Sequence, residues 1–210
     1  MKTILCYGDS NTYGHNPYDG SRYDKKLRWT TILNELLGDD YDVVPEGSKG
    51  RTTAYDREND DIKNGLTHYR AIYGTHRPVD IIIFMLGSND CCSDMGLSVD
   101  QIVNGMERLI ITAKEFALKK QTFSPKIILV APALIKGDVS KSPLSYLLDN
   151  DSITKSKQIV EPYRQLANKH GCTFLDASSL KVSETDCIHL VEESHEKLAH
   201  MLNEIIKNMN

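Results

Sequence analysis

Short apolar segments alternate with amphipathic segments along the whole chain. The short segments are rich in Ile, Val and Leu, and Gly, Pro, Asp or Ser bounds them. Several are apolar throughout instead of alternating with polar residues, which is typical of parallel strands covered on both faces. The pattern therefore predicts five strands, over residues 2–7, 41–45, 79–86, 126–131 and 172–176.

Apolar residues at spacings of three and four lie between these strands, as on one face of a helix. Gly38 and Gly74 follow two of the stripes, where glycine commonly ends a helix. Pro162 interrupts another segment and should kink that helix or mark a restart near Glu161. The pattern predicts helices over residues 29–37, 62–73, 102–116, 152–170 and 191–209.

The order of these segments indicates the fold class. Strands that alternate with helices pack as a parallel sheet between two helical layers. We therefore expect an α/β fold, a three-layer α/β/α sandwich around a five-stranded, flavodoxin-like parallel sheet, in a single domain over residues 1–210. Residues 132–151 have no clean period and are too long for a plain connection, so we expect an excursion near a site.

The composition is that of an ordinary globular protein, and it excludes some function classes. The chain has 210 residues, 40% of them apolar, and a net charge of −4, whereas a dedicated nucleic-acid binder usually carries a basic face. The longest apolar run, Ile81–Leu86, is far shorter than the roughly 20 residues of a transmembrane helix. With no secretory signal visible, we expect a cytoplasmic protein with no nucleic-acid and no membrane partner.

The five cysteines indicate neither a disulfide framework nor a zinc site. Their number is odd, no C-x-x-C pair occurs, and Cys91 and Cys92 are adjacent. His195 and His200 are five residues apart, which is not the spacing of a zinc-protease helix. We therefore expect reduced thiols that pack as small hydrophobic groups, and we expect no metal and no cofactor.

Polar residues follow the strands where a binding site should form. In parallel sheets of this class, sites lie outside the carboxyl ends of the strands. Ser10 follows the first strand, Gly50 the second and Asn89 the third. Asp186 and His189 follow the fifth strand and precede the last helix. We expect these residues to meet at one edge of the sheet.

These residue types fit acyl transfer through a covalent intermediate. A serine hydroxyl is a weak nucleophile until a base takes its proton, and histidine is the usual base. Asp186 lies three residues before His189, so a turn there would let its carboxylate reach Nδ1. The Asn89 side chain and the backbone N–H groups of Gly50 and Ser10 could then stabilise the oxyanion.

Each of these residues also has a purely structural interpretation. Ser10 could cap the turn after the first strand, Gly50 could serve only a turn, and Asn89 could cap the next helical segment. Their occurrence in order after successive strands favours catalysis for all three. Gly47 and Asp90 are better explained as structural residues, Asp90 as a hydrogen-bonding support.

Four sequence blocks carry a resemblance to a known family. The chain resembles the SGNH (GDSL-type) hydrolases from Tyr7 to about His195, which is nearly its whole length. One block alone would be a weak signal, whereas four in this order are specific. Further residues are similar to the small bacterial arylesterase and acyltransferase branch. The blocks are GDSNTYG, GSKGRTT, GSND and DCIH, and the branch residues are Arg28-Trp29, Glu46-Gly47, Arg51-Thr52-Thr53 and Met85-Leu86-Gly87.

The resemblance implies a role for each matching residue. Ser10 would be the nucleophile, His189 the general base and Asp186 the residue that orients the base. The Ser10 amide, Gly50 and Asn89 would form the oxyanion hole.

Several positions depart from the family pattern. Asn11 stands where an aliphatic residue is common, and Tyr13 and His15 stand where the arylesterases often carry aromatic residues such as Trp. We expect these three residues to line a more polar substrate pocket, which keeps acetylated sugars open as substrates. Cys187 replaces a usual glycine between the acid and the base.

The favoured function is hydrolysis of small acyl esters of the acetyl type through an acyl-Ser10 intermediate, with acyl transfer to alcohols from the same intermediate. A carbohydrate O-deacetylase with the same triad is the alternative. A third candidate function is a non-enzymatic, flavodoxin-like phosphate-binding module. The loops of this chain match no phosphate-binding motif, and this function would leave the pairing of Asp186 with His189 unexplained. The expected partner is a small-molecule ester. Apolar residues within 132–151 could cover the pocket or join a second copy in a homo-oligomer.

Overall fold

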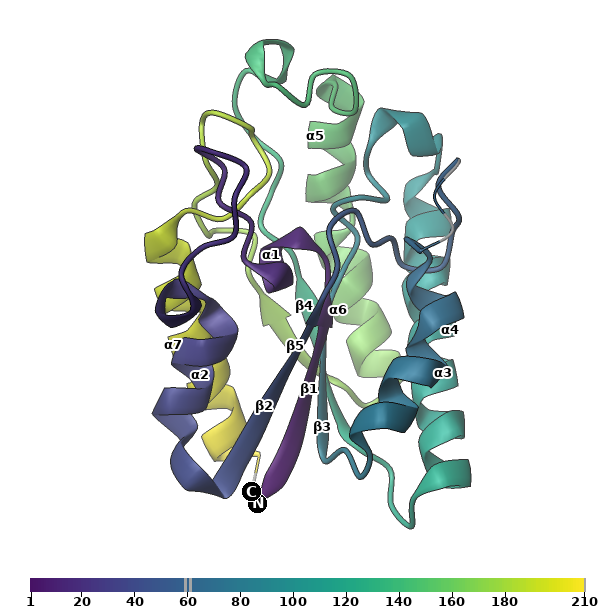
Figure 1. Cartoon of the computed structure of the whole chain (residues 1–210). Coiled ribbons are helices and arrows are strands. Elements are labelled where there is room, and N and C mark those ends of the chain that lie inside the picture. Colours follow the sequence, from purple (N-terminus) through teal and green to yellow (C-terminus); the bar gives the residue numbers. More distant parts are fainter. Residues whose placement is uncertain (59, 61, 210) are drawn as a thin grey trace.

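Five parallel strands form one sheet in the computed structural model, which describes residues 1–58, 60 and 62–209. The strands are β1 (Lys2–Gly8), β2 (Tyr41–Gly47), β3 (Ile81–Met85), β4 (Lys126–Ala131) and β5 (Thr173–Asp176). Their order in the sheet is β2-β1-β3-β4-β5, so the chain starts inside the sheet and adds strands on either side (Figure 1). Each predicted strand segment is confirmed, and the parallel α/β sandwich with it.

Helices connect the strands and cover both faces of the sheet. In the described part of the chain they are α1 (Ser10–Tyr13), α2 (Trp29–Leu37), α3 (Gly65–His76), α4 (Val99–Lys120), α5 (Asn150–Gln158), α6 (Val160–Lys169) and α7 (Glu192–Asn208). Helices α2 and α7 pack together on one face, and α3, α4 and α6 cover the other (Figure 1). Within these ranges, no helix has both the length and the hydropathy of a membrane-spanning segment.

Because both faces are covered, successive residues of a strand alternate between two apolar cores. On β1, Leu5 and Tyr7 face the core beneath α3, α4 and α6, whereas Ile4 and Cys6 face the core beneath α2 and α7. All four side chains are fully buried. This burial on both faces explains why the strand segments are apolar throughout in the sequence.

The helix predicted over residues 62–73 starts later than its apolar stripe. The Asn64 side chain caps it by accepting a hydrogen bond from the Thr67 N–H at 3.1 Å, so the helix begins at Gly65. Ile62 lies before this cap and is 55% exposed. The prediction of Ile62 on the buried face of the helix is therefore wrong.

Two other helix boundaries show how far glycine and proline determine where helices end. Helix α3 passes through Gly74 and continues to His76, so it ends three residues, or nearly one turn, beyond the predicted end. The segment predicted over 152–170 consists of two helices that meet at Ile159. Pro162 lies in the first turn of the second helix, where proline is tolerated, and this confirms the predicted restart.

The loops that follow the carboxyl ends of the strands gather at one end of the molecule (Figure 1). Both ends of the chain lie together at the opposite end of the sheet. The fold therefore separates the chain termini from the loops that hold the candidate site.

A pair of leucine substitutions tests the assignment of the core. Leu198 of α7 is fully buried, whereas Leu118 of α4 is 64% exposed. Leu198→Ala should lower the free energy of unfolding by about 2–5 kcal/mol, because it leaves a cavity. Leu118→Ala should change it by less than about 0.5 kcal/mol. Urea denaturation measures both, and similar losses would contradict this packing.

Candidate active site

The turn after β1 places Ser10 at the base of the site. The strand ends at Gly8, where a Cβ would lie 2.1 Å from Thr12 Oγ1, so only glycine lets α1 begin this close to the strand. Asp9 caps α1 by accepting a hydrogen bond from the Asn11 N–H at 2.9 Å. Ser10 is the first residue of the helix, and its side chain is nearly fully buried.

Three of the predicted site residues form a continuous chain of hydrogen bonds. His189 Nε2 lies 2.8 Å from Ser10 Oγ, and His189 Nδ1 lies 2.7 Å from Asp186 Oδ2. The other Asp186 oxygen accepts from the backbone N–H groups of Ile188 and His189 at 3.2 and 3.1 Å. The carboxylate thus orients the imidazole so that Nε2 faces the serine, which is the arrangement a general base requires.

The Asp186 carboxylate is held in its charged form. Burial alone would raise its pKa, but the hydrogen bonds and the charge of His189 outweigh burial and lower the pKa. An ionised carboxylate at this position stabilises the imidazolium that forms when the histidine takes up a proton.

The residue between Asp186 and His189 adopts a left-handed backbone conformation. Cys187 has a φ of 71°, and it is the non-glycine residue with positive φ among those the structure describes. An L-residue in this region costs about 1–2 kcal/mol relative to a right-handed conformation. The turn explains why glycine suits this position, and it lets the acid and the imidazole three residues later meet at 2.7 Å.

Asn89 and Gly50 lie beside Ser10 at the same pocket. Asn89 Nδ2 lies 3.1 Å from the Arg51 carbonyl oxygen and 3.4 Å from Asp9 Oδ2, so the carboxamide is fixed in orientation. Gly50 has a φ of 76°, which favours glycine. Neither the Ser10 N–H nor the Gly50 N–H donates a hydrogen bond to any described residue. Both backbone donors are therefore available to a substrate oxygen.

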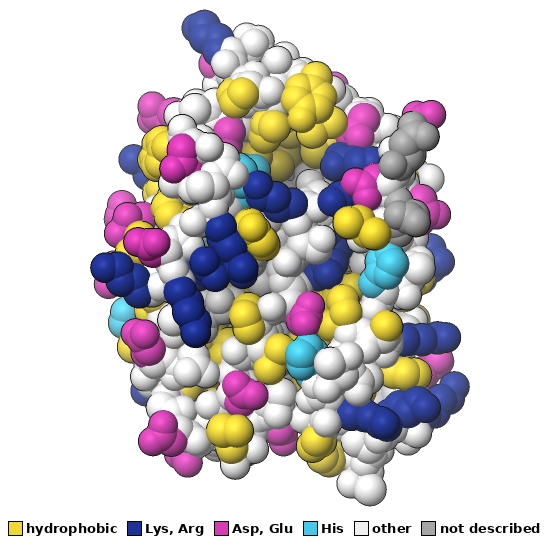
Figure 2. Space-filling view, viewed as in Figure 1, with side chains coloured by type: hydrophobic (Ala, Val, Ile, Leu, Met, Phe, Trp, Pro, Cys, Tyr) yellow, Lys and Arg dark blue, Asp and Glu magenta, His cyan; other side chains and the backbone are white. Residues whose placement is uncertain are grey.

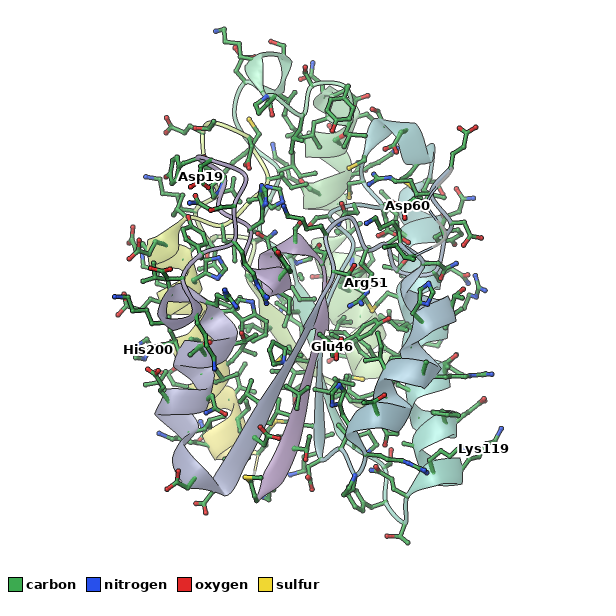
Figure 3. The ribbon with its side chains drawn as sticks, in the orientation of Figure 1. Asp19, Glu46, Arg51, Asp60, Lys119 and His200 are labelled. Carbon is green, nitrogen blue, oxygen red and sulfur yellow. The ribbon has the colours of Figure 1, made fainter. Side chains whose placement is uncertain are left out.

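Arg51 connects the loops that carry these donors (Figure 3). Its Nη1 donates to the Gly8 carbonyl oxygen at 2.9 Å and to the Glu46 carbonyl oxygen, and its guanidinium lies 4.2 Å from the centre of the Tyr7 ring. Its own carbonyl oxygen accepts from Asn89. The sequence suggested Arg51 only as a residue similar to the family and gave no sign of this buried role.

Two further carboxyl groups lie beneath the site. Asp9 and Asp90 are buried, and burial raises the pKa of each to about 6. Asp90 accepts from the Thr53 N–H at 3.0 Å and from the Thr53 hydroxyl at 2.5 Å. This contact ties the loop after β2 to the loop after β3, which is the structural support that the sequence predicts for Asp90.

A pocket of about 300 Å³ opens beside Ser10 and His189. The predicted excursion over 132–151 supplies one wall, through Leu144, Tyr146, Leu147 and Leu148. Cys92, beside the GSND block, also lines the pocket. Lys49 and Arg57 line it too, and the sequence did not identify these two residues as part of the site. Lys49 directly precedes Gly50 in the GSKGRTT block, and that position was the available signal.

Of the three residues expected to line the pocket, His15 does so and Asn11 and Tyr13 do not. The buried Asn11 side chain instead satisfies backbone groups, since its Oδ1 accepts from the Leu190 N–H at 2.9 Å. The Tyr13 ring packs under the Arg22 guanidinium at 4.2 Å. Asn11 thus ties α1 to the segment that carries the base, which corrects its predicted role.

The His15 ring packs against the His189 ring, with 4.1 Å between their centres. Burial, together with the charges of His189 and Lys49, lowers the His15 pKa to about 4, so this imidazole is neutral at pH 7. Among the described residues, His15, Asp186 and His189 form the group that could hold a metal ion, with ligand atoms within 4.8 Å of one another. Because Asp186 and His189 already bond each other, a metal there would compete with their hydrogen bond.

Comparison with known proteins identifies the family. The sequence matches the profile of GDSL-like lipases and acylhydrolases over residues 6–201. The chain belongs to this family. No curated protein matched the chain.

Solved structures similar to this acylhydrolase agree in fold along their whole length. The native aryl esterase of M. smegmatis has a TM-score of 0.92 and 30% sequence identity, with all of both chains covered. A carbohydrate acetylesterase of Sinorhizobium meliloti has a TM-score of 0.90 and 30% identity, again over all of both chains. The protein is therefore a carboxylic ester hydrolase with the α/β fold of its family, as the sequence predicts.

An asparagine substitution tests the raised pKa of Asp9. Asp9→Asn keeps an acceptor for the Asn11 N–H but cannot ionise. Because the pKa of Asp9 is about 6 in the folded protein and about 4 in an unfolded chain, the folded state holds an extra proton between these values. The stability of the wild type relative to Asp9→Asn should therefore fall as pH rises from 4 to 6, by at most about 1.4 kcal/mol per pH unit. Urea unfolding of both proteins across this range measures the difference, and a constant difference would refute the shift.

Proposed function

We propose that this acylhydrolase is a serine esterase that cleaves small acyl esters of the acetyl type through an acyl-Ser10 intermediate. The observation that carries the proposal is the hydrogen-bond chain from Asp186 through His189 to Ser10 Oγ at the wall of the pocket. Membership in a family of acylhydrolases supports the same chemistry.

Acylation would begin when Ser10 Oγ attacks the ester carbonyl carbon and His189 Nε2 takes the hydroxyl proton. The carbonyl oxygen becomes negatively charged in the tetrahedral intermediate. The N–H groups of Ser10 and Gly50 would stabilise this charge. The side-chain NH₂ of Asn89 would do so as well when the hydrogen of its long 3.4 Å contact with Asp9 Oδ2 turns to the oxyanion. His189 then gives its proton to the alcohol oxygen as the carbon–oxygen bond breaks, and the alcohol leaves.

Deacylation repeats these steps with water in place of the serine. His189 takes a proton from water, the hydroxide attacks the acyl carbon, and Ser10 Oγ leaves with the proton that the imidazole returns. An alcohol in the position of the water would give acyl transfer to that alcohol. None of these steps requires a metal or a cofactor.

A carbohydrate O-deacetylase remains the second candidate, with the same residues in the same roles. Two observations favour it, the likeness to carbohydrate acetylesterases of Sinorhizobium meliloti and the polar residues His15 and Lys49 at the pocket. A carbohydrate O-deacetylase should have a higher kcat/KM for acetylated oligosaccharides than for phenyl acetate, and an esterase of small acyl esters should have the reverse preference. The phosphate-binding module is rejected, because the chain belongs to a family of acylhydrolases. A homo-oligomeric state and a cytoplasmic location stay predictions.

Removal of the Ser10 hydroxyl is the first test. Ser10→Ala should lower kcat for 4-nitrophenyl acetate by about 10⁴-fold or more, because no acyl-enzyme can form. The matched control is Ser140→Ala, at an exposed serine, and it should keep the wild-type rate. Labelling with a fluorophosphonate should add mass to the wild type and to Ser140→Ala but not to Ser10→Ala. Equal turnover by Ser10→Ala and the wild type would refute the proposed nucleophile.

Asn89→Ala tests the oxyanion hole separately from the nucleophile. The substitution removes one side-chain donor, so kcat should fall by about 10²–10³-fold while KM changes little. Initial rates over a range of ester concentrations separate the two parameters. A change in KM alone would reassign Asn89 to substrate binding.

A further inference from the structure

We propose that the pocket accepts esters whose alcohol part carries an anionic group, a carboxylate or a phosphate, and that Lys49 contacts this group. The inference rests on the proposed esterase function and narrows its substrate class. The charges on the pocket wall, the position of Lys49 and the apolar residues beside it each support part of it.

The pocket wall carries cations and no carboxylate. Lys49 and Arg57 line the pocket, and no Asp or Glu among the described residues does so. The whole chain has a net charge of −4, so the local charge is opposite to the overall charge. Figure 2 shows Lys and Arg side chains on both sides of a recess below the apolar patch at the top of this face. A recess lined by one sign of charge attracts ligands of the opposite sign.

The charge of Arg57 is compensated by a neighbouring carboxylate. Arg57 Nε lies 2.8 Å from Asp94 Oδ2, and Nη2 donates to Asp94 Oδ1 at 3.1 Å. Arg57 Nη1 lies 3.6 Å from the position that a Cβ on Gly50 would occupy. The ion pair with Asp94 therefore fixes the Arg57 guanidinium as part of the pocket wall beside Gly50. Of the two cations at the pocket, Lys49 is then the one that can bind a ligand anion.

The charge of Lys49 is not compensated in this way. Its side chain is exposed, and its Nζ donates to the Gly20 carbonyl oxygen at 3.2 Å. No carboxylate among the described residues lies within ion-pair distance of this Nζ. The Asp19 carboxylate, whose charge affects the His15 pKa, accepts a hydrogen bond from the Ser21 N–H at 2.9 Å and does not form an ion pair with Lys49. Lys49 is therefore able to bind an anion that enters the pocket.

The position of Lys49 relative to His189 indicates which part of the substrate it meets. The leaving alcohol must take a proton from His189 Nε2, so the alcohol lies on the side of the pocket that His189 forms. His15 packs against His189 on that side, and Lys49 is close enough to His15 for its charge to affect that imidazole. The anion that Lys49 binds would therefore belong to the alcohol part of the ester.

Apolar residues surround the rest of the alcohol. Leu144, Leu147 and Ile188 line the pocket, and Tyr146 is 71% exposed among them. A cation near an apolar wall suits a compact, partly apolar alcohol with an anionic end, such as a hydroxybenzoate. The ester class that fits is a short acyl ester of such an alcohol.

The test compares two acetyl esters of similar shape, 3-acetoxybenzoate, which is an anion, and 3-acetoxybenzamide, which is neutral. The measured quantity is the ratio of kcat/KM for the anion to kcat/KM for the amide. Intrinsic reactivity cancels when this ratio is compared between variants. In Lys49→Gln the ratio should fall about two- to fivefold, as for the loss of an exposed ion pair. Lys49→Arg should restore the ratio, and added salt should lower it in the wild type but not in Lys49→Gln.

Lys119→Gln is the matched control. It removes the same charge from an exposed lysine of α4 that lies at the opposite end of the molecule from the pocket (Figure 3). Its ratio should equal that of the wild type. A third ester, 3-acetoxyphenyl phosphate, distinguishes the two anions. In Lys49→Gln, the ratio of kcat/KM for this phosphate ester to kcat/KM for the amide is compared with the ratio for the benzoate ester. A greater fall in the phosphate ratio supports a phosphate ligand, and a smaller fall supports a carboxylate.

Two results would overturn the inference. One is an unchanged ratio in Lys49→Gln for both anions. The other is an equal loss of kcat/KM for the anionic and the neutral esters, because Lys49 would then act on the reaction in general. Failure of the esterase function itself is distinguishable, since the wild type would then hydrolyse neither ester or Ser10→Ala would hydrolyse both.

Discussion

The arrangement of the active-site loops depends on the hydrogen bonds of the buried Arg51 guanidinium. It donates to carbonyl oxygens at the ends of β1 and β2, while its own carbonyl oxygen accepts from Asn89 after β3. A buried cation costs desolvation free energy, which these carbonyl dipoles and the face of the Tyr7 ring offset. The loops that follow β1, β2 and β3 are therefore held at fixed distances from one another. The serine, the glycine N–H and the carboxamide keep their relative positions because of it.

Most of the fold and the membership of the site could be predicted from the sequence. The apolar strands and the helical stripes fix a parallel sheet, and a parallel sheet brings every strand exit to the same edge. Residues far apart along the chain then meet without any local signal of contact. Ser10 and His189 are 179 positions apart, yet their side chains lie 2.8 Å from each other.

Side-chain direction within the loops could not be predicted. Asn11 and Tyr13 lie in the expected segment, but buried backbone groups and the Arg22 guanidinium determine where their side chains point. Ile62 fits the apolar stripe of α3, but the cap at Asn64 excludes it from the helix. A single lysine such as Lys49 belongs to no periodic pattern, and its place at the pocket follows only from the folded loop.

Both ends of the chain lie at the end of the sheet opposite the loops that follow the strands (Figure 1), and those loops line the pocket. A purification tag, a fused protein or a tether to a solid support would therefore start far from the site and leave the path of bulky esters clear. The same closeness of the ends suits circular permutation, in which a short linker joins them and new ends are opened in an exposed loop. Ends opened in the exposed loop near Tyr146 would separate the apolar wall into two segments and so make the access of large alcohols adjustable.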